Sequence, residues 1–191
     1  MRPTATLLLL ALVTWFATLA AAGASAMAAF ATLPKVGVTV SGVEGFFGAD
    51  TAEMGRYAAG RMLAPVFLTA DWVQFACSAL AVGCTVRLAR CGALRGTRVA
   101  RVALCASVGV AAALLAIHAW RAPAMNGDLL AYWQAIDAGD RDAATAAKAS
   151  FDAAHRIADA GFRATLAAVL VAIASFTAAT VPGTNAHAAA A

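Results

Sequence analysis

The chain has 191 residues, of which 62% are hydrophobic and only 13% are charged. This composition is too apolar for an ordinary soluble domain. The net charge of +4 comes from one short stretch, because without its five arginines the chain carries about −1. These arginines are Arg87, Arg90, Arg95, Arg98 and Arg101. Their clustering predicts a membrane-topology signal with lipid-headgroup contacts, and no zinc-finger spacing or Gly-rich phosphate loop supports nucleic-acid binding.

The first apolar run covers residues 4–33 and contains no charged residue. A helix needs about 20 apolar residues to cross a bilayer, so this run predicts a membrane span. A cleaved signal peptide is the alternative, because Arg2 precedes the run and the Ala-Ser-Ala at residues 24–26 resembles a cleavage site. The apolar character continues through Phe30, and this length favours a retained span.

A Gly-rich, mildly acidic connection follows, and it can hold a short interfacial or re-entrant segment around Phe46 and Phe47. The second apolar run covers residues 57–88, and Pro65 inside it predicts a kink. The third run covers residues 102–120. Both are long enough to cross a membrane.

A polar stretch then leads to the fourth run at residues 161–181. Within this stretch, Asp128 is a candidate N-cap for a short amphipathic helix, which Gly139 would end. Asp140 is a candidate N-cap for the next helix, which is rich in alanine and has no breaker before the fourth run. We therefore expect an outer amphipathic helical segment over residues 128–160. Its alanine-rich second helix should continue into the fourth span and protrude about 30 Å from the membrane.

Together these elements predict an all-α fold, a four-transmembrane-helix bundle with a long extramembrane extension of the fourth helix. The bundle forms a single domain over residues 1–181, and residues 182–191 are expected to be a disordered tail. The arginine-rich loop should face the cytoplasm, and four spans then place both termini there. The expected location is the cytoplasmic (inner) membrane of a bacterium. The lipid bilayer is the expected partner, together with a second copy or another membrane protein.

Polar side chains gather toward the outer ends of the spans, where the helices of an antiparallel bundle would bring them to one level. Polar groups in a membrane are costly, so their presence predicts a functional site. We expect a polar, partly hydrated outer pocket. Its candidate residues are Arg61, Asp71, Gln74, His118, Arg121, His155, Asp159 and Arg163.

Two of these residues are candidate metal ligands. His118 and His155 come from consecutive helices at the same membrane side, so both could reach one copper ion or haem iron. Asp159 lies one turn after His155 and could orient its ring. A belt of ion pairs at the interface is the alternative, in which Asp159 pairs with Arg163 or Arg156.

Asp71 lies well inside the second run, where a carboxylate costs about 2.5–3.5 kcal/mol on insertion scales. One interpretation is a structural ion pair with Arg61, Arg163 or His155, and the other is movement of protons or small solutes.

Cysteines recur every seven residues along the second run, at Cys77, Cys84 and Cys91. They share one helix face, and with Cys105 they could form a path for copper(I). No CxxC or CxC clamp is present, so core packing is the favoured interpretation.

Three short segments carry a resemblance. They are Phe30 to Pro34, the Ala-Gly and Leu-Ala-Pro-Val-Phe sequences within residues 59–67, and the Phe151-x-x-x-His155 spacing. They resemble a family of small four-helix membrane proteins of unknown function, the bacterial domain of unknown function 4149 type. This family is related to a eukaryotic transmembrane protein associated with platinum-drug resistance. The resemblance implies the four-span fold and no defined activity.

The leading hypothesis is an uncharacterised, non-enzymatic integral membrane protein that acts as a scaffold or as a subunit of a membrane complex. The alternatives are a haem- or copper-binding membrane protein that uses His118 and His155, and a protein that moves protons or small solutes with Asp71. No GxSxG motif occurs, and no residue is assigned a catalytic role.

Overall fold

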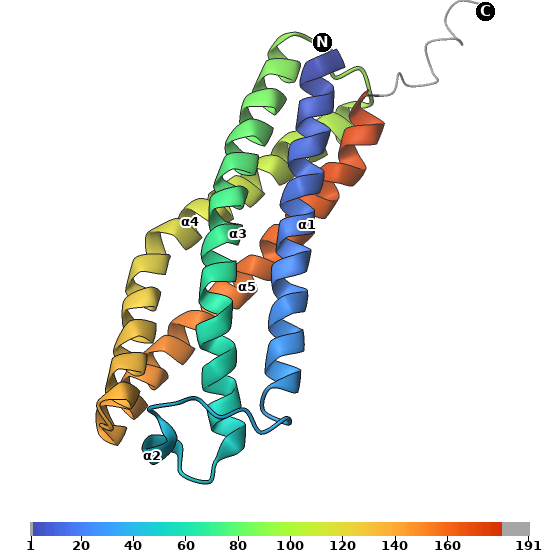
Figure 1. The fold of residues 1–191 in the computed structure, drawn as a ribbon. Coiled ribbons are helices and arrows are strands. Elements are labelled where there is room, and N and C mark those ends of the chain that lie inside the picture. Colours follow the sequence, from blue (N-terminus) through green and yellow to red (C-terminus); the bar gives the residue numbers. More distant parts are fainter. Residues whose placement is uncertain (1, 181–191) are drawn as a thin grey trace, which may run out of the picture. The chain divides into compact units, whose positions relative to one another are not determined.

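The computed structural model describes residues 2–180, and within this range all elements are helices. They are α1 (Arg2–Thr32), α2 (Glu44–Phe47), α3 (Thr51–Arg90), α4 (Arg98–Asp137) and α5 (Arg141–Thr180), as labelled in Figure 1. Among the described residues, four helices are long and apolar enough to cross a membrane: α1, α3, α4 and α5. The all-α prediction is confirmed, and these helices indicate an integral membrane protein. The predicted tail at residues 182–191 lies outside the described residues.

Helix α4 is longer than the sequence predicted. It does not stop at Trp120 but continues through Pro123 to Asp137, so Asp128 lies inside a helix and caps none. The carboxylate of Asp128 instead accepts a hydrogen bond from Ser150 Oγ at 2.7 Å, which joins α4 to α5. A proline or a capping residue such as Asp128 is a weak signal for a helix boundary, because packing between helices can override it.

The turn between α4 and α5 forms as the sequence predicted. Gly139 has a φ of 74°, and its N–H donates to the Ile136 carbonyl at 3.0 Å. The Asp140 N–H donates to the Ala135 carbonyl at 2.9 Å, which completes a Schellman motif. Asp140 then caps α5, because its Oδ1 accepts the Ala143 N–H at 3.0 Å. From this cap α5 runs unbroken from Arg141 to Thr180.

The described chain forms two compact units, and each long helix contributes one segment to each of them. The first unit contains residues 2–20, 71–116 and 161–180, and the second contains residues 21–70 and 117–160.

The core of the first unit is apolar and closely packed. Along α1, Leu8, Leu12, Trp15 and Leu19 follow helical spacing on one face and are 0–1% exposed. They pack with aliphatic, alanine and cysteine side chains of α3, α4 and α5. The opposite helix faces are apolar as well, and Leu10 is 57% exposed. A helix that is apolar all round is typical of a protein whose outer surface contacts lipid.

Gly96 permits a close backbone contact in the loop between α3 and α4. Its N–H donates to the carbonyl of Ala179, near the end of α5, at 2.8 Å. A Cβ atom at position 96 would lie 2.0 Å from the carbonyl oxygen of Ala178. Only glycine therefore fits, and the loop is joined to the end of α5.

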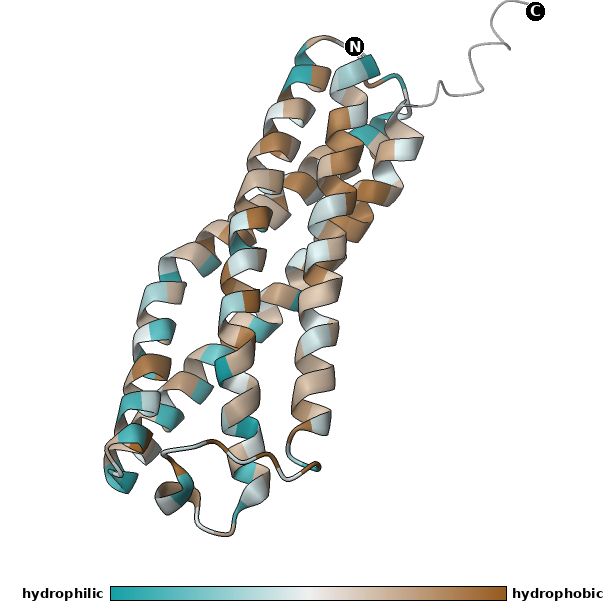
Figure 2. Ribbon diagram, viewed as in Figure 1, coloured by the Kyte–Doolittle hydropathy of each residue, from teal (hydrophilic) through white to brown (hydrophobic). Residues whose placement is uncertain are grey.

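The second unit has a smaller core with more aromatic residues. Phe47 of α2 packs against Tyr57 of α3, with ring centroids 5.5 Å apart, and Ile136 of α4 is 1% exposed. Arg141, the first residue of α5, donates from Nη2 to the Phe46 carbonyl at 2.6 Å. The short segment expected around Phe46 and Phe47 is thus the one-turn helix α2. It contacts α3 through Tyr57 and α5 through Arg141. Figure 2 shows that hydrophilic residues are frequent near α2 and at the α4–α5 turn.

Candidate functional site

One polar grouping within the second unit is centred on Arg61 of α3. Its Nη2 lies 3.7 Å from Oδ2 of Asp137, the last residue of α4. Its guanidinium carbon lies 5.0 Å from the ring centroid of Trp133 and 5.5 Å from that of Tyr57. The Tyr57 hydroxyl donates to Oδ1 of Asp137 at 3.2 Å. We call these four residues the Arg61 cluster.

The Arg61 cluster joins α3 to α4. The ion pair is half exposed, at 45% for Arg61 and 49% for Asp137, and such pairs contribute about 0.2–1 kcal/mol. Each cation–π contact adds about 0.5–1 kcal/mol at an exposed site. Both carboxylate oxygens of Asp137 already have partners within the cluster. Its contacts therefore support a structural role.

A second polar arrangement lies in the apolar core of the first unit. The indole Nε1 of Trp15 donates to Oε1 of Gln74 at 3.3 Å, and both residues are buried. Gln74 in turn donates from Nε2 to Oδ1 of Asp71 at 3.4 Å. The amide of Gln74 is thus oriented by a donor on one side and a carboxylate on the other. This pairing lowers the cost of burying each polar group.

The two units divide the eight residues predicted for an outer pocket. Asp71, Gln74 and Arg163 belong to the first unit, while Arg61, His118, Arg121, His155 and Asp159 belong to the second. Within the first unit the structure brings Gln74 and Asp71 together. Within the second, Arg61 contacts Asp137, which was not among the predicted residues. A single pocket formed by all eight stays a prediction.

His155 is exposed and stacks on Phe151, which lies one turn earlier on α5. The ring centroids are 5.2 Å apart and the planes differ by 19°. This is a local i, i+4 contact of the kind that stabilises a helix. His118 and Asp159 are half-buried, and Arg121 is exposed.

Within residues 2–180, no group of three or more His, Cys, Asp or Glu side chains is arranged to hold a metal ion. A haem iron needs only two histidines as axial ligands. Coordination of haem or copper by His118 and His155 stays a prediction.

All four cysteines are free thiols. Cys77 and Cys84 are buried in the core of the first unit, as the packing interpretation predicted. Cys91 and Cys105 are exposed, so the core-packing interpretation is wrong for these two.

Sequence reasoning missed Asp137, Tyr57 and Trp133 as partners of Arg61. Asp137 is followed by a helix-ending glycine signal, which marked the end of a helix but gave no partner for its carboxylate. Tyr57 and Arg61 are four residues apart on α3 and share a face. That spacing was a usable signal for an aromatic–cation contact.

Comparison of this chain with protein-family models, with curated proteins and with solved structures finds no match in any of the three.

Proposed function

We propose that the chain is a non-enzymatic integral membrane protein that acts as a scaffold or as a subunit of a membrane complex. The observation that supports this most directly is the pairing of polar groups within the apolar core. Trp15 donates a hydrogen bond to Gln74, and Gln74 donates one to Asp71. A transport path would expose such groups to water or substrate, whereas a packing role needs them satisfied inside the protein.

The proposed location is the cytoplasmic (inner) membrane of a bacterium, with the arginine-rich α3–α4 loop and both termini in the cytoplasm. The polar segments of α4 and α5 would then lie outside the membrane. The polar segment of α5, the fourth span, would form the expected extension. Polar contacts in this region support exposure to water, including Lys148–Asp152 at 2.8 Å and Ser150–Asp128 at 2.7 Å.

The proposed partner is a second copy or another membrane protein. Large apolar side chains project from the helices, and Trp72 of α3 is 69% exposed. A photo-crosslinking residue in place of Trp72 should give a discrete protein adduct in native membranes, because a tryptophan on a helix surface is a frequent interface anchor. The same residue at Leu10 of α1 is the control for a position that faces lipid. Lipid adducts alone at both positions would contradict the scaffold role.

Replacement of Asp71 by Asn separates the scaffold from ion movement. In vesicles with a trapped pH-sensitive dye, the scaffold predicts no proton flux above that of protein-free vesicles. Asp71→Asn should lower thermal stability, because the amide weakens the bond from Gln74. The matched control is Asp142→Asn at an exposed position in the first turn of α5. Proton flux in the wild type that is lost in a well-folded Asp71→Asn variant would overturn the proposal.

A further inference from the structure

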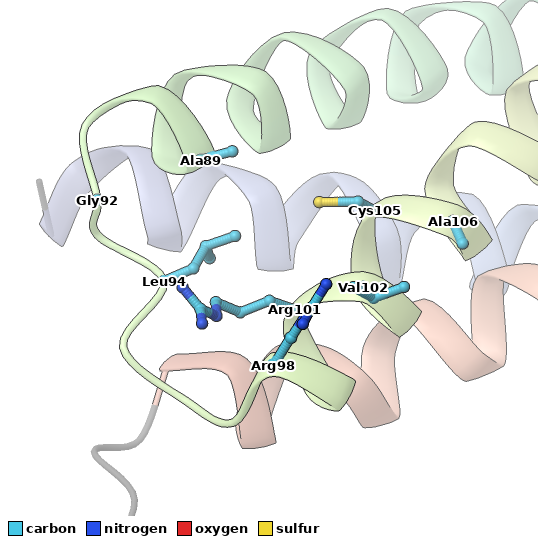
Figure 3. Close-up of a pocket in the computed structure, with 8 residues that line it drawn as sticks. All are labelled: Ala89, Gly92, Leu94, Arg98, Arg101, Val102, Cys105 and Ala106. Carbon is cyan, nitrogen blue, oxygen red and sulfur yellow. The ribbon is translucent and has the colours of Figure 1, made fainter.

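A groove lies at the arginine-rich end of the first unit, between the last turn of α3 and the first turns of α4. Its volume is about 690 Å³, which falls within the about 300–1,000 Å³ of ligand sites. Apolar side chains form most of its wall, among them Ala89, Leu94, Val102 and Ala106. Figure 3 shows Arg98 and Arg101 beside one another on α4 at the edge of this space. The groove therefore combines an apolar wall with two cations.

The two arginines lie in a long stretch of sequence without acidic residues. The sequence contains no Asp or Glu between Asp71 and Asp128. Within the part of the chain that the structure describes, Arg98 and Arg101 form no ion pair with a carboxylate. They are three residues apart and share one face of α4. Their charges are thus available to one anion that enters the groove.

The start of α4 adds to this positive potential. Thr97 caps the helix, since its Oγ1 accepts the Ala100 N–H at 3.2 Å. The first turn of the helix carries the positive end of the backbone dipole and no acidic residue. Guanidinium groups match the geometry of phosphate oxygens, with two parallel N–H donors each.

We propose that this groove binds one anionic phospholipid, with its phosphate between Arg98 and Arg101 and an acyl chain along the apolar wall. The proposal rests on the membrane insertion described above and not on the scaffold role, so it stands or falls independently of the flux experiment. An amphipathic anion is the ligand class that satisfies both halves of the groove. A soluble phosphate would leave the apolar wall unoccupied.

The test is native mass spectrometry of the full chain released from detergent with phosphatidylglycerol or phosphatidylcholine of the same acyl chains. We expect one retained phosphatidylglycerol per chain, with at least about tenfold preference over the zwitterionic lipid. The double variant Arg98→Gln/Arg101→Gln should lose this preference. Ala106→Phe keeps both arginines but fills the groove, so it should also lose the bound lipid.

The matched control is Arg2→Gln/Arg95→Gln, which removes the same charge from positions that do not line the groove. It should retain the lipid. Equal loss in this control would show diffuse charge attraction and overturn the proposal. Equal retention of both lipids by the wild type would show that the arginines do not select the headgroup, and it would overturn the proposal as well. Displacement of the lipid by millimolar inorganic phosphate would overturn it as well.

A measurement on the wild-type chain avoids any effect of substitution on folding. Cys105 lines the groove and Cys91 does not, yet both thiols are exposed. Phosphatidylglycerol should slow alkylation of Cys105 by N-ethylmaleimide and leave Cys91 unaffected, as peptide mass mapping would show. No difference between the two cysteines would contradict a lipid bound in this groove.

Discussion

The indole Nε1 of Trp15 donates a hydrogen bond to the side-chain oxygen of Gln74 at 3.3 Å, and this bond joins α1 to α3 inside an apolar core. Trp15 is 0% exposed and Gln74 is 6% exposed. Neither group can turn to water when its partner is removed. The bond therefore links α1 to α3 at one level of the core, in addition to their apolar packing.

We predict that Gln74→Leu lowers the free energy of unfolding by about 1–2 kcal/mol, because it leaves the Trp15 N–H unpaired at nearly constant volume. Thermal unfolding in detergent, followed by tryptophan fluorescence, measures this change. Gln134→Leu on an exposed face of α4 is the control and should change stability by less than about 0.5 kcal/mol. Equal effects of the two substitutions would contradict a structural role for the bond.

Arg61→Gln should destabilise the protein by about 1–3 kcal/mol, the sum of an exposed ion pair and two cation–π contacts. Asp137→Asn should cost less, about 0–1 kcal/mol, because the amide still accepts the Tyr57 hydroxyl bond. Denaturation at low and high salt measures both. Arg56→Gln removes an exposed i, i+3 pair with Glu53 on the same helix and is the matched control. If Arg61→Gln matched that control, the aromatic contacts would contribute nothing.

Gly96→Ala should destabilise the protein by at least about 2 kcal/mol, since the new Cβ would meet backbone atoms that cannot move independently. It would also break the 2.8 Å bond to the Ala179 carbonyl. Gly109→Ala is the matched control, because beyond the adjacent backbone of α4 no atom lies within 4 Å of a Cβ at that position. The control should be neutral or stabilising by about 0.4–1 kcal/mol. A neutral Gly96→Ala variant would show that the loop is not held against α5.

The scaffold proposal also predicts that the purified protein is colourless and lacks stoichiometric copper. An absorption spectrum of oxidised and reduced samples, with metal analysis, checks this. A Soret band that disappears in His118→Ala or His155→Ala would identify a haem protein. Stoichiometric copper without that band would instead support the histidines and cysteines as ligands.

The parts of the fold that follow from local chemistry were predictable from the sequence. Apolar length identified the four long helices, and Gly139 with Asp140 correctly marked the α4–α5 turn. The continuity of α4 was not predictable from the same kind of signal. Pro123 and Asp128 resemble a helix boundary, but both lie within α4 in the structure.

The candidate site was less predictable, because it depends on contacts between residues far apart in the sequence. Gln74 was identified because a polar residue in an apolar run is unusual, yet nothing local indicated Trp15 as its partner. Arg61 was one of three candidates to neutralise Asp71, together with Arg163 and His155. The carboxylate that Arg61 contacts belongs to Asp137, at the end of another helix. Which carboxylate it contacts depends on how α3 and α4 align, and helical periodicity does not encode that alignment.

The most direct test is the accessibility of one native and one introduced cysteine to a membrane-impermeant maleimide in intact cells. Cys91 is exposed at the end of α3, and Ala138 is exposed in the α4–α5 turn. We predict that Cys91 is labelled only after the membrane is permeabilised, whereas Ala138→Cys in a Cys91→Ser background is labelled in intact cells. Labelling of both positions in intact cells, or the opposite pattern, would contradict a membrane protein with its arginine-rich loop in the cytoplasm.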